Sequence, residues 1–485
     1  MKKRILSIAL FSVLLVSCGE TDAPVTGGTD NEGVTSTENV VTSPLDALPT
    51  ADFGQSEFHI FGETQTALGD YFDVAEQTGE AIDDAVWKRN RAVEEKYNIK
   101  LVFNLQMWGY LKAPETIRTL TLAGDDSYDL YTATHLYLGS LAAEHYFFDW
   151  KEVPNVNLDA DWYIKKANDT FSIGTSTPLL FGDFMESNIL RCWNFAFNKR
   201  LAEENKLDDL YSVVEDGKWT VDYLRTVTKD LMRDLNGNSK ADDSDFYGFA
   251  IDKLSGLDAF SRSLGLNAIT KDKDNLPVLS YYNENVTRAF EKVYDLIWDS
   301  EGTYVANESL GHINTLFAES RAVIASFRFD QFMNAEIRDM KDDYGVLPYP
   351  KLDEGDGGYG TYLSGTFSAQ MISSLKPESE YAKIGMITEA LNAYGHEYVT
   401  PAIYEITLKT KTSRDEKSVE MLDLILDSRE YSFDSCDESN FNLSPIKTIR
   451  KLIGSSKSKD IASYYASNEA SAKKWVETMI EAYNK

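Results

Sequence analysis

The sequence predicts an α/β fold divided into two lobes, on three observations. Residues 56–132 alternate strand-like and helix-like apolar patterns, which indicates a βαβ unit and a mainly parallel sheet. Residues 51–485 exceed the roughly 250 to 300 residues at which a single hydrophobic core stops growing. This stretch also contains no long polar linker. We therefore expect two lobes between which the chain crosses several times.

The elements of the first unit follow from the spacing of its apolar residues. Strands are predicted over 56–61, 99–105 and 128–132, where apolar and polar residues alternate. Helices are predicted over 82–97 and 114–123, where apolar residues recur every three or four positions. Right-handed crossovers between such strands bring the loops after the strands to one end of the sheet, where ligands commonly bind.

Later segments repeat this mixture of elements, and the last hundred residues are mostly helical in pattern. Strands or extended segments are predicted over 190–197, 321–327, 344–349 and 359–374, and helices over 221–233 and 286–298.

The first 17 residues have the pattern of a signal peptide. Lys2, Lys3 and Arg4 precede an apolar stretch over 5–16, which is shorter than the roughly 20 residues of a membrane span. The stretch ends in LVSC, which resembles the lipobox of bacterial lipoproteins and implies that Cys18 is acylated. The alternative is an ordinary signal peptide with a chance cysteine. Acyl chains on Cys18 would hold the protein at a membrane surface, in the cell envelope and outside the cytoplasm.

Residues 18–50 are predicted to form the lipidated cysteine and a flexible tether. Residues 19–50 contain no aromatic residue, lysine or arginine and are rich in Thr, Gly, Asp and Glu. Such a composition buries too little apolar surface to offset the entropy lost on ordering.

Charge and cysteine content limit the possible functions. The formal net charge of -30 would repel phosphate backbones, which excludes nucleic acid as a partner. Beyond Cys18, the chain holds Cys192 and Cys436 and no CxxC pair. The two thiols either pair in an oxidising compartment or remain buried and free, and their spacing does not decide between these outcomes.

Four stretches, in this order, are similar to the family 1 extracellular solute-binding proteins, the receptor components of carbohydrate ABC transporters. They are DDAVWKRN with EEKYNI (83–99), YDLY (128–131), WNFAFNK with KWT (193–220), and FAESRAVI with YGVLPYP (317–350).

The resemblance implies a two-lobed, periplasmic-binding-protein-like (type II) α/β fold with a hinge and a ligand cleft between the lobes. It places lobe 1 at 55–183 plus 366–415 and lobe 2 at 184–365 plus 416–485. It further implies that the protein, as a monomer, captures a sugar or oligosaccharide by hinge closure and delivers it to ABC permease subunits. No catalysis is expected.

Sugar sites combine flat aromatic rings with a few oriented polar groups, because sugars present both apolar ring faces and hydroxyls. Candidates are residues in loops just after predicted strands, residues at the first crossing between lobes, and residues in a Gly-rich stretch. Packing or surface roles are the alternative for each. The candidate ligand-binding residues are Glu63, Trp108, His135, Trp193, Arg328, Asp330, Tyr359 and Tyr362.

Residues 234–245 have the ligand spacing of an EF-hand-like or dockerin-like calcium loop. Oxygen-bearing side chains occupy positions 1, 3, 5, 9 and 12, and position 7 offers a backbone carbonyl. Two departures are Ser239 at the usual glycine position and an aspartate at position 12. The alternative is an acidic, solvated turn. The candidate ligands of a structural Ca²⁺ are Asp234, Asn236, Asn238, Lys240, Asp242 and Asp245.

Two rival functions remain: a secreted glycoside hydrolase and a surface adhesin that binds glycans. A hydrolase needs two carboxylates about 5 to 9.5 Å apart across a cleft. The sequence contains no P-loop, G-x-S-x-G or H-E-x-x-H motif. An adhesin favours an open aromatic platform, whereas a transporter receptor needs an enclosed cleft.

Overall fold

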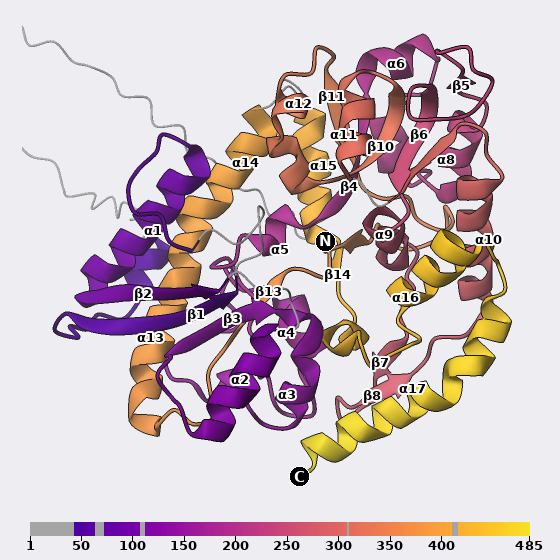
Figure 1. Cartoon of the computed structure of the whole chain (residues 1–485). Helices are drawn as coiled ribbons and strands as arrows, with labels where there is room; N and C mark the ends of the chain where they lie inside the picture. The colour runs from indigo at the N-terminus through magenta and orange to yellow at the C-terminus, as the bar shows by residue number, and fades with distance from the viewer. Residues whose placement is uncertain (1–42, 64–71, 107–111, 308–309, 410–415) are drawn as a thin grey trace, which may run out of the picture. The chain divides into compact units, whose positions relative to one another are not determined.

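Two main β-sheets organise the chain (Figure 1). The computed structural model describes residues 43–63, 72–106, 112–307, 310–409 and 416–485. Within the described part, Pro44–Lys485 form one compact unit. The predicted signal peptide, the lipidated Cys18 and most of the predicted tether lie outside the described residues.

The first sheet has the strand order β13–β3–β1–β2. β1 (Ser56–Glu63) pairs in parallel with β2 (Ile99–Gln106) and with β3 (Leu130–Thr134). β13 (Ser368–Met371) closes the other edge and runs antiparallel to β3. The mainly parallel sheet predicted from residues 56–132 is therefore confirmed.

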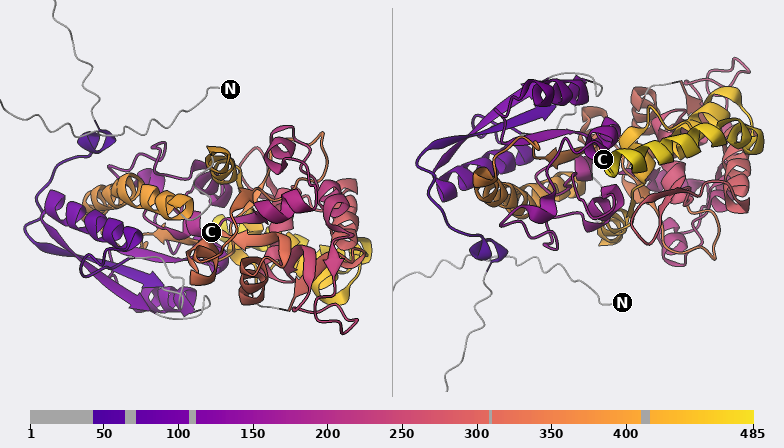
Figure 2. Two further views of the ribbon diagram at one scale, coloured as in Figure 1. Left: turned by 90° about the horizontal axis from the view of Figure 1, so that it is seen from above. Right: turned by 90° about the horizontal axis from the view of Figure 1, so that it is seen from below.

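Helices cover both faces of the first sheet. β2 and β3 lie on opposite sides of β1, so right-handed crossovers put α1 (Ala81–Tyr97) and α2 (Lys112–Ala123) on opposite faces. α13 (Glu378–Tyr394) lies beside α1 in the views of Figures 1 and 2 and packs against it. Phe58 and Ile60 of β1 pack with α1 and α13, whereas Phe61 belongs to the other hydrophobic cluster. The alternation of β1 thus supplies both faces of the core.

The second sheet is mixed, with the order β11–β4–β10–β6–β5 and β9 beside β6. β4 runs antiparallel to β10 and β11, and β6 runs parallel to β10 and β9. Its strands are β4 (Trp193–Asn198), β5 (Met232–Arg233), β6 (Phe246–Asp252), β9 (Thr303–Ala306), β10 (Ala322–Arg328) and β11 (Tyr344–Leu347).

Two small sheets and further helices complete the fold. β12 (Thr361–Tyr362) pairs with β14 (Arg429–Glu430), and β7 (Ile269–Lys271) pairs with β8 (Pro277–Leu279). The remaining α-helices are α3 (Gly139–Ala143), α4 (Lys165–Phe171), α5 (Ser187–Leu190), α6 (Lys199–Glu204), α7 (Leu210–Glu215), α8 (Val221–Thr228), α9 (Ser255–Ser263), α10 (Glu284–Trp298), α11 (Leu310–Ala318), α12 (Ala335–Arg338), α14 (Thr400–Lys409), α15 (Glu416–Asp427), α16 (Pro445–Ile449) and α17 (Ile461–Tyr483).

The chain passes between the two main sheets more than once. It leaves the first sheet after β3, builds the second from β4 to β11, and returns to the first with β13. α13 packs on α1 of the first sheet, and α15 packs on β11 of the second. The predicted boundaries of the lobes, 55–183 plus 366–415 and 184–365 plus 416–485, stay a prediction.

Three predicted segments were wrong in part. The helix predicted over 221–233 ends at Thr228, because Met232 and Arg233 pair with β6 as β5. The strand predicted from residue 190 begins at Trp193, because Ser187–Leu190 form α5. The tether predicted to residue 50 ends earlier, since Pro44–Ala47 form a 3₁₀ helix and Leu48 is buried in the core.

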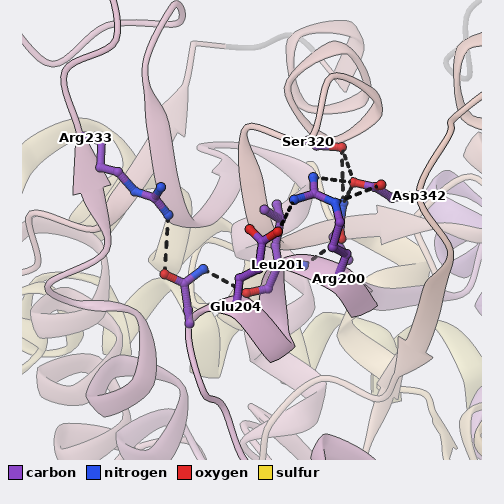
Figure 3. Close-up of polar contacts among 8 residues, drawn as sticks. Arg200, Leu201, Glu204, Arg233, Ser320 and Asp342 are labelled. Carbon is purple, nitrogen blue, oxygen red and sulfur yellow. Dashed lines mark hydrogen bonds and ion pairs between the residues drawn. The ribbon is translucent and has the colours of Figure 1, made fainter.

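A polar network holds α6 at the end of β4 (Figure 3). Arg200 donates from Nε and Nη2 to the two carboxylate oxygens of Asp342, at 3.0 and 2.7 Å. Asp342 also accepts from Asn198 at 2.9 Å and from Ser320 at 2.6 Å. These donors hold the pKa of Asp342 well below its usual range, with Arg200 as the largest cause. The carboxylate therefore ties α6, β4 and the turn before β10 together.

Cys192 and Cys436 are buried and free, so the alternative of two unpaired thiols is the one found. Burial raises the pKa of the Cys192 thiol to about 12. Among the described helices, none is both long and apolar enough to cross a membrane.

Candidate functional site

A pocket of about 370 Å³ opens where the end of α9, the start of α10 and the segment 351–360 meet. Most of its side chains are polar, and one aromatic ring joins them. The polar and aromatic lining residues are Arg262, Ser263, Asn267, Asn283, Asn285, Lys351, Asp356, Tyr359 and Glu430.

Local structure explains why these side chains meet. Arg262 and Ser263 occupy the last turn of α9, and Gly265 (φ 67°) turns the chain back in a left-handed conformation that favours glycine. Asn283 caps α10 by accepting a hydrogen bond from the Val286 N–H at 3.1 Å. The third wall is the segment 351–360, in which Lys351 donates to the carbonyl oxygens of residues 354 and 356 at 3.0 and 3.2 Å.

Tyr359 supplies an aromatic ring to this pocket. Its hydroxyl donates to the carbonyl of Val214 at 2.9 Å, so the polar end of the side chain is already engaged. Burial raises the pKa of Tyr359 to about 12, and the hydroxyl stays protonated. What the side chain offers a ligand is therefore its ring, in a pocket that the amides of Asn267 and Asn285 also line. A ring face with a few amides and charges is the lining that sugar ligands require.

A small hollow shares Arg262 and Glu430 with the pocket and contains two further candidates, His135 and Tyr362. His135 is fully buried, stacks on Phe367 at 3.9 Å, and has Nδ1 3.2 Å from the Phe367 carbonyl oxygen. Tyr362 is 4% exposed, and its hydroxyl accepts from the Gly365 N–H at 3.1 Å. Both side chains pack in the interior beside the pocket.

The other ring nitrogen of His135, Nε2, lies 3.0 Å from the hydroxyl oxygen of Ser435. A Ser–His contact is the beginning of a nucleophilic arrangement. Burial, however, lowers the pKa of His135 to about 3, so the imidazole is a weak base. The contact therefore joins three distant chain segments, at residues 135, 367 and 435, and gives no support to a hydrolytic role.

Three more candidates meet away from the pocket. Arg328 donates from Nε and Nη2 to the two oxygens of Asp330, each at 2.7 Å, and Arg191 reaches Asp330 at 3.0 Å. The guanidinium of Arg328 lies 6.0 Å from the ring centroid of Trp193, which is its register partner across β4 and β10. All four side chains are buried. The structure thus makes Trp193, Arg328 and Asp330 one interior cluster, and none of them lines the pocket or the hollow.

The last two candidates fall at the limits of the described residues. Glu63 is the final residue of β1, and its side chain lies outside the described part. Trp108 lies outside the described residues altogether. Conversely, sequence reasoning missed Arg262, Asn267, Lys351 and Glu430. Arg262 stands in an ordinary amphipathic helix, and the other three come from separate segments that only the fold brings together.

The predicted calcium loop connects β5 to β6 and folds around its own side chains. Asp234 accepts from the Gly237 and Ser239 N–H groups at 2.7 and 2.8 Å. Asp245 accepts from the Leu235 N–H at 3.0 Å, so the two ends of the loop lie together. Ser239 adopts φ 59°, the left-handed turn for which an EF-hand uses glycine at position 6.

The residues of the loop fit a hard cation in chemistry, since carboxylate, amide and carbonyl oxygens are what Ca²⁺ prefers. The side chain of Asp242, at position 9, accepts from the amides of Asn236 and Asn238 at 3.1 and 2.6 Å. Within the described residues, no group of three or more His, Cys, Asp or Glu side chains is arranged to hold a metal ion. Calcium binding therefore stays a prediction that depends on the amide and carbonyl oxygens as well.

No family model matches the sequence, and no curated protein matches it. Similar solved structures include the galacto-N-biose-/lacto-N-biose I-binding protein of a Bifidobacterium longum ABC transporter, in complex with lacto-N-biose (TM-score 0.55, 11% identity, 88% of this chain and 98% of that one).

Two further similar structures are the GacH receptor of Streptomyces glaucescens, solved unliganded and with acarbose (TM-score 0.54, 13% identity, 88% and 98% covered), and the maltose/maltodextrin-binding domain MalE of Bdellovibrio bacteriovorus, bound to maltotriose (TM-score 0.53, 12% identity, 87% and 100% covered). The chain therefore has the two-lobed α/β fold of solute-binding proteins, as predicted.

Proposed function

We propose that this protein is the receptor of an ABC uptake transporter and that it captures a sugar or oligosaccharide without chemically altering it. The observation that carries the proposal is the pocket, whose lining combines the ring of Tyr359 with the amides of Asn267 and Asn285. The fold supports it, because the similar structures are binding proteins whose ligands are sugars. Hinge closure around the ligand would present the loaded receptor to permease subunits.

The proposal includes a location outside the cytoplasm. The apolar stretch over 5–16 and the lipobox-like LVSC support export and acylation of Cys18. A monomer tethered by a lipid would remain near its permease while it samples the surrounding solution.

A saturable thermal shift with one sugar of a mono- and oligosaccharide panel is the expected result. A ligand that binds only the folded protein adds about 2.7 kcal/mol of stability at a hundredfold excess over its Kd. The same mixtures are analysed for reaction products. No shift with any sugar would contradict the sugar-receptor proposal, and turnover of a sugar would establish a hydrolase instead.

Tyr359→Ala is expected to weaken binding of that sugar roughly 10- to 100-fold, because the ring contact and its buried apolar area are lost. Isothermal titration of the wild type and the variant measures the change. Tyr359→Phe is the matched control: it keeps the ring, loses only the bond to Val214, and should bind nearly as well as the wild type. Equal losses in both variants would mean that Tyr359 acts through packing of the segment 351–360 and not through the ligand.

We also propose that the loop 234–245 binds a structural Ca²⁺, which fixes the connection between β5 and β6. The support is the closed loop, with Asp245 beside Leu235 and the left-handed turn at Ser239. Calcium is expected to raise the melting temperature of the wild type, and Asp234→Asn should abolish the rise. Asp243→Asn, at a loop position that supplies no ligand in the predicted spacing, is the control and should retain it. A calcium response that survives Asp234→Asn would place the ion elsewhere.

A further inference from the structure

Two buried cations of the pocket have no carboxylate partner among the residues that the structure describes. Arg262 is 3% exposed and Lys351 is 5% exposed. Within the described residues, neither forms an ion pair with an acidic side chain, and Glu438 feels the charge of Arg262 only at longer range. Other buried arginines do pair: Arg89 with Glu186, and Arg328 with Asp330. Because an unpaired buried charge is costly, the pocket is a place where a negative group would be stabilised.

Arg262 also has free donors. Its Nη1 donates to the carbonyl of Leu266 at 2.9 Å and to the side chain of Asn267 at 3.5 Å. In the described part of the chain, its Nε and Nη2 hydrogens meet no protein acceptor. These two N–H groups form one edge of the planar guanidinium, and that edge matches two oxygens of a carboxylate or a sulfate.

The two acidic residues that line the pocket bind groups other than Arg262 and Lys351. Glu430 is bonded to Lys166 of α4. Asp356 accepts from the N–H of residue 353 at 2.8 Å. Lys351 donates to backbone carbonyls of its own loop, so it contributes positive charge without a paired anion. The formal charges of the four ionisable lining residues, Arg262, Lys351, Asp356 and Glu430, therefore cancel in sum, but in the described part of the chain neither carboxylate forms an ion pair with Arg262 or Lys351.

Ser263 adds an independent observation. The residue is 5% exposed and lines the pocket, and its hydroxyl oxygen has no hydrogen-bond partner in the described part of the chain. A buried hydroxyl without a partner costs about 1 to 3 kcal/mol, which a ligand oxygen would recover. Ser263 follows Arg262 directly in α9, and both residues line the pocket.

We propose that the pocket binds an anionic saccharide, with a carboxylate or sulfate of the sugar on the Nε–Nη2 edge of Arg262 and a sugar ring against Tyr359. This inference rests on the proposed function and names the substrate class. Arg262 and Lys351 both lie close to residues 359 and 360. The Lys351 ammonium is 5.6 Å from the ring centroid of Tyr359, and a side chain at Gly360 would collide with the Arg262 carbonyl oxygen. The anion and the ring would therefore be recognised side by side.

The test compares a galacturonic acid oligomer with the neutral galactose oligomer of the same length, by titration calorimetry on the protein. The acidic sugar should bind roughly 10- to 100-fold more tightly, as expected for charge-assisted hydrogen bonds of about 1.5 to 3 kcal/mol. Arg262→Met should remove that preference, while Arg262→Lys should keep part of it. Arg225→Met, which removes the same charge from α8 outside the pocket, is the matched control and should keep the full preference.

The outcomes separate the two proposals. Equal binding of the acidic and neutral oligomers would overturn the anionic preference and leave the sugar receptor standing. If neither oligomer binds and no other sugar binds either, the receptor proposal itself is contradicted. Saturation by inorganic sulfate as tight as that of the acidic oligomer would also overturn the inference, because the pocket would then hold a simple anion. The comparison in the wild type requires no variant, so a folding defect in Arg262→Met leaves the test decisive.

Discussion

Asp330→Ala is expected to lower the free energy of unfolding by about 3 to 5 kcal/mol, the usual cost of removing one partner from a buried ion pair. Asp330 is 3% exposed and holds two buried guanidinium groups, those of Arg328 and Arg191. Without the carboxylate, both positive charges would remain in the interior and would lose this ion pair. Urea denaturation of the wild type and the variant measures the difference.

The control for this experiment is Asp339→Ala, at an exposed position that ends α12, where a change within about 0.5 kcal/mol is expected. Binding of the sugar identified in the panel distinguishes a structural role of Asp330 from a role in ligand contact. If Asp330 is an interior ion-pair partner, the folded variant should bind that sugar as the wild type does. An unchanged stability together with lost binding would instead restore the ligand-contact role predicted from its place after a strand.

Arg89→Leu alone is expected to lower the free energy of unfolding by a similar amount, about 3 to 5 kcal/mol. Arg89 of α1 is fully buried; its Nη1 lies 2.8 Å from Glu186 and donates to the Phe184 carbonyl at 3.1 Å. The variant would leave the Glu186 carboxylate buried without its cation, at the segment where the chain passes from the first sheet toward the second. Thermal and urea unfolding of the variant measure this loss.

Arg91→Leu on the same helix is its matched control. Arg91 pairs with Glu94 three residues on, with its own side chain 48% exposed, and such helix-surface pairs are worth only about 0.3 to 0.5 kcal/mol. Arg89→Leu combined with Glu186→Leu should recover much of the loss, because no lone charge remains. If Arg89→Leu costs no more than Arg91→Leu, the buried pair does not stabilise the fold.

Local periodicity predicted the first unit closely. The helix predicted over 82–97 is α1 (Ala81–Tyr97), and the strand predicted over 99–105 is β2 (Ile99–Gln106). These boundaries follow from the spacing of apolar residues and from Asn98, whose left-handed conformation ends the helix. Both signals lie within a few residues of the boundary, so the local sequence is enough to predict it. The pairing of β12 with β14, in contrast, joins Thr361 to Arg429, which are far apart in the sequence. Each strand has only two residues, so no local apolar pattern predicts the pairing.

The candidate site shows the same limit. Tyr359 was predicted from its place in a Gly-rich stretch near the expected edge of the cleft, and it does line the pocket. Arg328 and Asp330 have the polar character expected after a strand, but the structure pairs them with each other. Whether a buried charge faces a protein partner or a ligand depends on segments far away in the sequence. Arg262 lies in an ordinary amphipathic helix, and only the fold brings it to the pocket.

The position of β13 has a consequence for the order in which the chain completes its structure. Ser368 pairs with Thr134, so the first sheet lacks its edge strand, and α13 its place on α1, until residues 368–394 have followed. Every strand of the second sheet lies between residues 193 and 347 and is therefore delivered earlier. We expect the half of the molecule that begins first along the chain to be finished last, with its apolar face uncovered in the meantime.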